Sequence, residues 1–411
     1  MRVKFITLLV LFFSEIHVQA QKPMLRSGSW LAAVVRQDGR QIAFNMEWLS
    51  SGSWVIINGT ERINIDDIIT IGDSLEWHMP VFESFFRAKI QADGSLMGYW
   101  YKGSSTATQV WPFYARPGVE QRFEALKGPA KYRLNGRWAV SFTRKDGTKR
   151  AAIAELHQEA DRLSGSILTP SGGYRYLDGI VTGDSMILSV FDGSNAYLLT
   201  GKIRDDRHIA LGTFYSGPAG IEPWQAVYQP DAALPQDAAG MTMKEGYQRL
   251  SFRFPALDGR LVSINDDSYK NKVVVIQIMG SWCSNCMDET RFLSQYYKAN
   301  RHRGVEVIAL AYEYSSDPVR SGTSLRKFKE RFNVEYPMLL TGVAVNDPER
   351  TQKTLPEITD IKVFPSTLFI GRDGKVKAFH AGFYGPGSGG HYEESKQFFE
   401  STVDRLLKEP G

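Results

Sequence analysis

Short apolar and alternating runs, separated by turn residues, dominate the chain from residue 23 to residue 229. Residues 54–57 and 187–191 are two such runs, and glycine, aspartate and asparagine lie between runs of this kind. A period of two places the apolar side chains on one face of a β-strand, and the intervening residue types favour turns. The pattern therefore predicts an all-β region over this half of the chain.

The all-β region contains an internal repeat. Trp30 recurs as Trp138, 108 positions later, and Trp111 recurs as Trp224, 113 positions later. The repeated segments keep their order and their spacing changes only by a loop length, so we interpret the region as two copies of one β-unit. Each copy has room for about six to eight short strands in a meander, closing into a small barrel or forming a sandwich. Recurring tryptophans are typical of core positions, and a ligand-stacking role is the alternative.

After residue 246 the pattern changes to apolar runs that alternate with segments of helical period, which predicts an α/β fold. Strands are expected at 273–278, 305–311, 338–340, 363–370 and 375–380, and helices at 287–298, 324–332, 348–355 and 391–407. The predicted fold class is multidomain, an N-terminal all-β tandem repeat followed by a C-terminal α/β fold. The predicted boundaries are a signal peptide at 1–20, β-units at 23–115 and 132–229, a linker at 230–246 and an α/β domain at 247–409.

Both cysteines of the chain, Cys283 and Cys286, follow the predicted strand at 273–278 and precede a helix. A helix N-terminus favours a thiolate over a thiol, which makes Cys283 the expected nucleophile. Cys286 is one turn further along the same face and is the expected resolving thiol. Two cysteines are too few ligands for a structural zinc site, and the seven histidines form no HxxxH or HExxH motif. We expect a redox pair with no metal and no cofactor.

Composition and charge narrow the class of protein. The apolar fraction of 43% and the charged fraction of 23% are typical of a soluble globular protein. The net charge is +4 without a dense run of Lys and Arg, so no nucleic-acid partner is expected. Arg2, Lys4 and the apolar run at 5–13 indicate a secretory signal, with an uncleaved anchor as the alternative. No cysteine follows the signal, so a lipoprotein is not expected and the mature protein is predicted to be exported and soluble.

Two elements of the α/β domain resemble a known family. Trp282 with the CxxC pair follows the buried strand, and Phe364-Pro365-Ser366-Thr367 precedes a predicted hairpin. With these elements the segment 247–407 resembles thioredoxin, and in detail the TlpA/ResA-like thiol–disulfide oxidoreductases of bacterial envelopes. The resemblance implies that Pro365 is cis and lies beside the CxxC, where the Phe364 backbone can pair with an extended substrate. The β-units match no family that we identify.

The resemblance also implies that Glu289 handles protons near Cys286. Helical spacing places the two residues on one face, so Glu289 should be partly buried and its pKa raised. Gln277 stands where thioredoxin has a buried aspartate and cannot take a proton. Glu289 is therefore the expected proton acceptor of the protein.

The sequence predicts a periplasmic protein thiol–disulfide oxidoreductase that runs as a reductase. Its expected partners are disulfide-bearing envelope proteins and a membrane-bound electron donor, and Trp282 with the Phe364-Pro365 backbone would form an apolar substrate rim. One alternative is a binding or adaptor protein whose β-units capture a ligand or partner, with a secondary redox domain. Another is a peroxiredoxin-like peroxidase, which would need a TxxC motif, whereas Gly280 lies three residues before Cys283.

Overall fold

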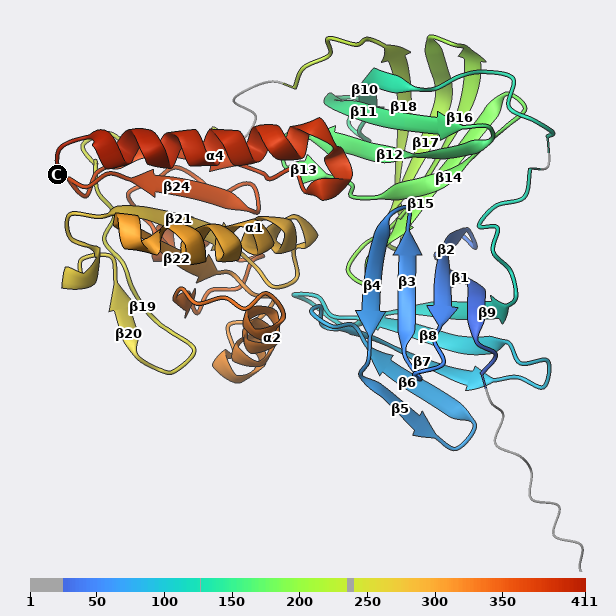
Figure 1. The fold of residues 1–411 in the computed structure, drawn as a ribbon, viewed down its shortest axis with the longest axis horizontal. Helices are drawn as coiled ribbons and strands as arrows, with labels where there is room; N and C mark the ends of the chain where they lie inside the picture. The colour runs from blue at the N-terminus through green and yellow to red at the C-terminus, as the bar shows by residue number, and fades with distance from the viewer. Residues whose placement is uncertain (1–24, 126, 235–239) are drawn as a thin grey trace, which may run out of the picture.

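The computed structural model describes residues 25–125, 127–234 and 240–411, which fold into three parts (Figure 1). Two all-β units occupy residues 28–117 and 136–228, and an α/β domain follows them. We call these parts β-unit 1, β-unit 2 and the α/β domain. The predicted signal peptide lies outside the described residues. Within the described ranges no helix has the length and apolar character needed to cross a bilayer.

β-unit 1 is a nine-stranded antiparallel sheet in the order β4-β3-β2-β1-β9-β8-β7-β6-β5. Successive strands are neighbours except β4 and β5, which lie at opposite edges of the sheet, and the pairing of β1 with β9 joins the two halves of the meander. Alternate residues of its strands are buried, as in β7, so one face forms the core. The strands are β1 (Gly28–Val35), β2 (Gln41–Trp48), β3 (Trp54–Asn58), β4 (Glu61–Ile65), β5 (Ile68–Ile71), β6 (Ser74–His78), β7 (Ser84–Ile90), β8 (Leu96–Lys102) and β9 (Gln109–Pro117).

β-unit 2 also has nine strands, in the order β11-β10-β18-β17-β16-β15-β14-β12-β13. Here β11 also pairs with β12, so the sheet closes on itself as a barrel. The strands are β10 (Gly136–Thr143), β11 (Lys149–Glu159), β12 (Arg162–Thr169), β13 (Gly172–Gly173), β14 (Leu177–Thr182), β15 (Ser185–Phe191), β16 (Ala196–Asp205), β17 (His208–Ser216) and β18 (Gly220–Tyr228).

The predicted class, barrel-like β-units followed by an α/β fold, is confirmed. The expected six to eight strands per unit is too low, because short strands such as β13 and β5 have no clear alternation.

The two β-units place their first tryptophan alike. The Trp30 indole Nε1 donates to the Arg26 carbonyl at 2.8 Å, and the Trp138 Nε1 donates to the Leu134 carbonyl at 3.0 Å, each four residues back. Both tryptophans are fully buried. Five more tryptophans of the β-units are buried, and these are Trp54, Trp77, Trp100, Trp111 and Trp224. The tryptophans therefore fill cores, as the core interpretation of the sequence predicted.

The α/β domain is built on a five-stranded sheet in the order β23-β22-β21-β24-β25. The strands are β21 (Val273–Met279), β22 (Val305–Ala311), β23 (Met338–Leu340), β24 (Ser366–Ile370) and β25 (Val376–Ala381). The hairpin β19 (Arg253–Pro255) and β20 (Leu261–Ser263) precedes it. The helices are α1 (Ser284–Asn300), α2 (Pro318–Arg331), α3 (Arg350–Thr354) and α4 (Gly390–Lys408), with the 3-10 turns η1 (Asp267–Tyr269), η2 (Arg301–Arg303) and η3 (Pro386–Ser388). In Figure 1, α4 and α1 run along the sheet toward the β-units.

Two helices begin earlier than the sequence predicted. Helix α2 starts at Pro318 and not at residue 324, because Asp317 caps it by accepting from the Val319 N–H at 2.9 Å and proline suits the first position. Helix α1 starts at Ser284 and not at residue 287.

The expected linker at 230–246 includes residues 235–239, which lie outside the described ranges, and its later part forms a β-bridge between Met243 and Ile358.

The α/β domain packs against both β-units (Figure 1). Buried apolar residues of β-unit 1, such as Phe82, and of α1, such as Met287, belong to one hydrophobic cluster. Glu83, after β6, pairs with Arg320 of α2 at 2.7 Å, and Glu155 of β-unit 2 contacts His391 of α4 at 2.9 Å. The β-units are therefore attached to the α/β domain at several helices.

Candidate active site

The two cysteines lie where β21 leads into α1. All seven residues of β21 are buried, so the strand fixes the chain just before the CxxC. Cys283 is the N-cap residue of α1, and its sulfur accepts a hydrogen bond from the Cys286 N–H at 3.1 Å. The two sulfurs are joined in a disulfide bond. The structure thus shows the oxidised form of the pair.

The two sulfurs differ in access. Cys283 is 6% exposed, whereas Cys286 is fully buried one turn deeper. When the pair is reduced, the free N–H groups and the dipole at the start of α1 favour a thiolate at Cys283. This geometry supports Cys283 as the attacking sulfur and Cys286 as the resolving one.

Glu289 is buried one turn after Cys286 on α1. Its carboxyl accepts hydrogen bonds from Thr367 Oγ1 at 2.5 Å and from Gln277 Nε2 at 2.7 Å. Burial raises the pKa of Glu289 from 4.5 to about 7, against the opposing effect of these two hydrogen bonds. The expected burial and raised pKa are confirmed, and a carboxyl that titrates near neutrality can take up or release a proton at physiological pH. Its role as the proton carrier stays a prediction.

An aromatic rim borders the cysteine pair. The Trp282 ring meets the Phe364 ring edge to face at a centroid distance of 5.4 Å and stacks on Tyr314 at 5.6 Å. The Trp282 Nε1 donates to the Tyr312 carbonyl at 2.8 Å, which fixes the indole. The Phe364–Pro365 peptide bond is cis, as the resemblance implied. Trp282 and Phe364 stay partly exposed and can offer an apolar surface to a substrate.

The loop between β15 and β16 in β-unit 2 binds the CxxC loop directly. The Ser284 hydroxyl donates to Asp192 Oδ2 at 2.7 Å and accepts from Asn195 Nδ2 at 2.9 Å. The Ser194 hydroxyl donates to the Trp282 carbonyl at 2.9 Å. β-unit 2 thus holds Trp282, which precedes Cys283, and Ser284, which follows it. No motif in the loop predicts this contact from the sequence.

A buried arginine ties three parts of the chain together beside the cysteine pair. Arg175 of β-unit 2 donates to the Ser284 carbonyl at 3.1 Å and pairs with Asp288 of α1 at 2.5 Å. It also pairs with Glu61 of β-unit 1, and its Nε lies 3.7 Å from Asp192 Oδ2. The three carboxylates raise the pKa of Arg175, against the effect of its burial. The guanidinium therefore stays charged, although burial raises the pKa of Asp288.

A second buried acid lies on the other side of the CxxC. Glu313, just after β22, accepts from the Ser281 N–H at 2.9 Å and from the Ser281 hydroxyl at 2.6 Å. Burial raises the pKa of Glu313 from 4.5 to about 7, while the bonds from Ser281 act in the opposite direction. Glu313 thus anchors the loop that enters the CxxC. No sequence signal distinguished it from the other acids of the chain.

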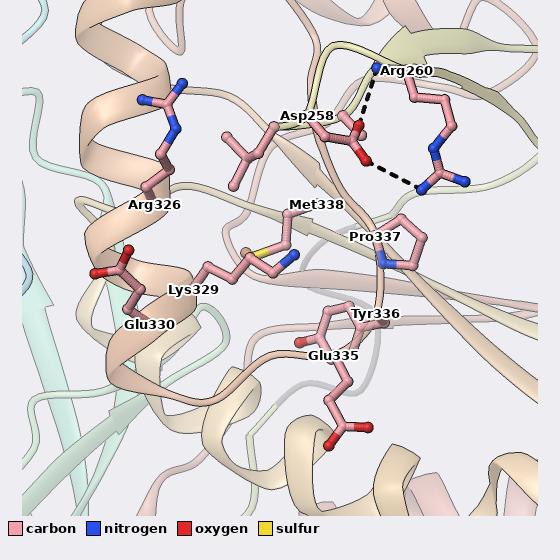
Figure 2. A pocket seen from close by; sticks show the side chains of 11 residues that line it. Asp258, Arg260, Arg326, Lys329, Glu330, Glu335, Tyr336, Pro337 and Met338 are labelled. Carbon is pink, nitrogen blue, oxygen red and sulfur yellow. Dashed lines mark hydrogen bonds and ion pairs between the residues drawn. The ribbon is translucent and has the colours of Figure 1, made fainter.

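Of the cavities that lie in the α/β domain or at its border, two of similar volume differ in whether a cysteine lines them. One, of about 350 Å³, lies between Cys283 and the β-units, and we call it the CxxC cavity. The other, of about 300 Å³, lies between the turn after β19, helix α2 and the segment before β23. Figure 2 shows that charged side chains line the second cavity and that Asp258 bonds to Arg260, and no cysteine is among its lining residues. Among the described residues no cluster of His, Cys, Asp and Glu is arranged to hold a metal ion.

Comparisons with known proteins concern the α/β domain. Residues 246–379 match the model of the AhpC/TSA family. The thiol–disulfide oxidoreductase ResA of Bacillus thuringiensis subsp. konkukian is 25% identical over 150 residues, which cover 34% of this chain and 77% of the relative. ResA of Bacillus subtilis is 24% identical over 135 residues, covering 33% of this chain and 66% of that protein.

Among solved structures, a putative thiol:disulfide interchange protein DsbE from Chlorobium tepidum is 20% identical with a TM-score of 0.31, and the alignment covers 40% of this chain and 99% of that one. The relatives named ResA support a thiol–disulfide oxidoreductase activity for the cysteine pair. The family match begins after the two β-units. Residues 246–379 of this chain therefore form an AhpC/TSA-family domain, and that domain is similar to the ResA thiol–disulfide oxidoreductases.

Proposed function

We propose that this protein is an exported thiol–disulfide oxidoreductase of the bacterial envelope that works as a reductase of protein disulfides. The observation that carries the proposal is the bonded pair itself, in which Cys283 opens to a cavity while Cys286 is buried one turn from an acid that titrates near pH 7. The N-terminal pattern of residues 1–20 supports export.

The reaction uses two thiol exchanges. The reduced Cys283 thiolate attacks one sulfur of the substrate disulfide, a bond forms between them, and the other substrate sulfur leaves as a thiolate and takes up a proton. Cys286 then loses its proton to Glu289 or to water and attacks the Cys283 sulfur. This step releases the second substrate thiol and leaves the Cys283–Cys286 disulfide, so two electrons pass to the substrate. A membrane-bound dithiol protein would restore the reduced form.

A trapping experiment tests the proposed exchange. In Cys286→Ala the resolving thiol is missing, so the mixed disulfide on Cys283 should accumulate and be visible on a non-reducing gel of envelope extract. Cys283→Ala should form no such adducts and is the matched control. If neither variant forms mixed disulfides, the proposed function is wrong.

The direction of electron flow has its own test. The midpoint potential of the Cys283–Cys286 pair should lie near that of thioredoxin, about −270 mV, for a reductase. A value near about −120 mV would indicate an oxidase.

A peroxidase assay with a thiol donor should give no turnover, because the Arg175 guanidinium is bound to three carboxylates and is not available to a peroxide.

A further inference from the structure

The CxxC cavity is built by all three parts of the chain. Cys283 and Phe364 of the α/β domain line it on one side, and Asn195 and Tyr197 of β-unit 2 line it on the other. Lys102, the last residue of β8, adds a side chain from β-unit 1. A substrate that reaches the Cys283 sulfur must therefore enter a space that the β-units partly enclose.

The walls of the cavity are fixed to the CxxC loop. Asn195 bonds to Ser284, and Tyr197 Oη bonds to Asn195 Oδ1 at 2.8 Å. Arg175 lies at the base of this contact with Asp288 and two further carboxylates. A buried charge that loses its ion-pair partner is left uncompensated and without water, so a network of this kind resists separation. The enclosed arrangement is therefore the one that a substrate meets.

The volume of the cavity limits the size of the substrate. A space of about 350 Å³ suits a small ligand or a few residues of an extended chain. Docking of a folded protein buries roughly 800 Å² on each partner, which needs an open surface around the reactive sulfur. The cavity thus selects disulfides that are carried on narrow groups.

The charge of the cavity points to an anionic substrate. Lys102, Arg175 and Asp192 are the charged residues that line it, and the last two belong to the buried ion network. Among residues 25–125, 127–234 and 240–411, no carboxylate oxygen lies within 4.0 Å of the Lys102 Nζ. Burial lowers the pKa of Lys102, and the more distant Asp192 opposes this effect. An ammonium group without an ion-pair partner, in the cavity of the reactive sulfur, is suited to a substrate carboxylate.

We propose that the CxxC cavity binds a disulfide on a narrow carrier, with Lys102 binding a carboxylate close to that disulfide. This inference rests on the proposed function and specifies its substrate class. The carboxylate can belong to a small dicarboxylic disulfide or to an acidic residue next to a cysteine in an extended peptide, and Lys102 recognises the same group in both.

A matched pair of compounds tests the charge requirement. The protein is reduced with dithiothreitol and freed of it, and its oxidation by 3,3′-dithiodipropionate or by the corresponding diamide is followed through tryptophan fluorescence. We expect the diacid to react about tenfold faster, which corresponds to about 1.4 kcal/mol. Lys102→Met should lose this preference, and Lys102→Arg, which keeps the cation, should retain it. Lys89→Met, at an exposed lysine of β7, is the control and should behave as the parent protein.

The outcomes separate the inference from the proposed function. A protein that reacts with neither compound and also fails to reduce insulin and a peptide disulfide contradicts the proposed function, whereas one that fails only with the two compounds overturns this inference alone. Equal rates with both compounds, or a preference that persists in Lys102→Met, overturn only the role of Lys102.

A second comparison uses an unstructured acidic peptide disulfide and insulin. The peptide should react faster than the folded protein, and a faster reaction with insulin would refute the narrow-carrier requirement. Comparing the peptide with the small diacid then identifies the preferred carrier.

Discussion

Glu289 offers the sharpest test of the electrostatics beside the cysteine pair. Its folded-state pKa of about 7 lies above its ordinary value of 4.5, because burial penalises the carboxylate. The folded protein therefore binds this proton more tightly than the unfolded chain does. The stability that the bound proton contributes is fully present below pH 4.5 and is lost as the pH rises through about 7.

The size of the effect follows from the two pKa values. A rise from 4.5 to about 7 corresponds to roughly 3.4 kcal/mol of difference between the protonated and ionised forms, and about 2.5 kcal/mol of this is lost between pH 5 and pH 8. Glu289→Gln cannot ionise and should not show this loss. The difference in unfolding free energy between the parent and Glu289→Gln should thus change by about 2.5 kcal/mol over this pH interval.

Urea unfolding of the oxidised proteins at several pH values measures this difference. Glu313→Gln should give a change of similar size, because Glu313 is also buried with a pKa of about 7. Glu400→Gln, at an exposed position of α4, is the control and should leave the pH dependence of stability as it is in the parent. A difference between the parent and Glu289→Gln that stays constant from pH 5 to pH 8 would refute the reasoning.

Three further predictions concern neighbouring contacts. Thr367→Val removes a hydrogen bond that favours the Glu289 carboxylate, so the pKa of Glu289 should rise and the loss of stability should move to higher pH, as a carbon-13 NMR titration of the Glu289 carboxyl would show. Arg175→Met leaves Asp288, Glu61 and Asp192 without their cation and should lower the unfolding free energy by about 3–5 kcal/mol in urea titrations, with part of the loss restored by adding Asp288→Asn. Gly98→Ala places a Cβ 2.0 Å from the Arg87 carbonyl oxygen and should cost about 1–3 kcal/mol in thermal unfolding, whereas Gly390→Ala, where a Cβ meets nothing within 4 Å, should not.

The elements best predicted from the sequence are those whose pattern is local. Strand β22 has the predicted bounds and β21 is one residue longer, because long runs of buried β-branched residues occur only where both faces of a sheet are covered. The start of α2 was wrong, since its first turn has no apolar period and is fixed by capping at Asp317. In strand β5 apolar character does not indicate a buried face, because Ile69 and Ile71 are 46% and 57% exposed.

The same distinction applies to the site. Cys283 and Cys286 were predicted from one strand-to-helix junction, and Glu289 was predicted from the family resemblance with helical spacing in agreement, so a single segment of sequence contains all three. Arg175 and Lys102 come from strands and loops more than 100 positions earlier. Their contribution depends on how the β-units dock on α1, and docking is decided by surfaces that no periodicity describes. The role of a buried carboxylate such as Asp288 likewise cannot be predicted from the sequence before its ion-pair partner is known.

The position of the β-units also decides how their role can be tested. Deleting residues 23–230 would expose the apolar residues that β-unit 1 shares with the α/β domain in one cluster, so lost activity after deletion would have two explanations. Substitutions in the loop that binds the CxxC keep that cluster intact. Ser194→Ala and Asn195→Ala each remove one contact to the CxxC loop, at the Trp282 carbonyl and at the Ser284 hydroxyl. If the β-units only recruit partners from a distance, the two variants should exchange with small disulfides at the rate of the parent. If the loop forms a wall of the CxxC cavity that the substrate contacts, the exchange rate of the variants should differ from that of the parent.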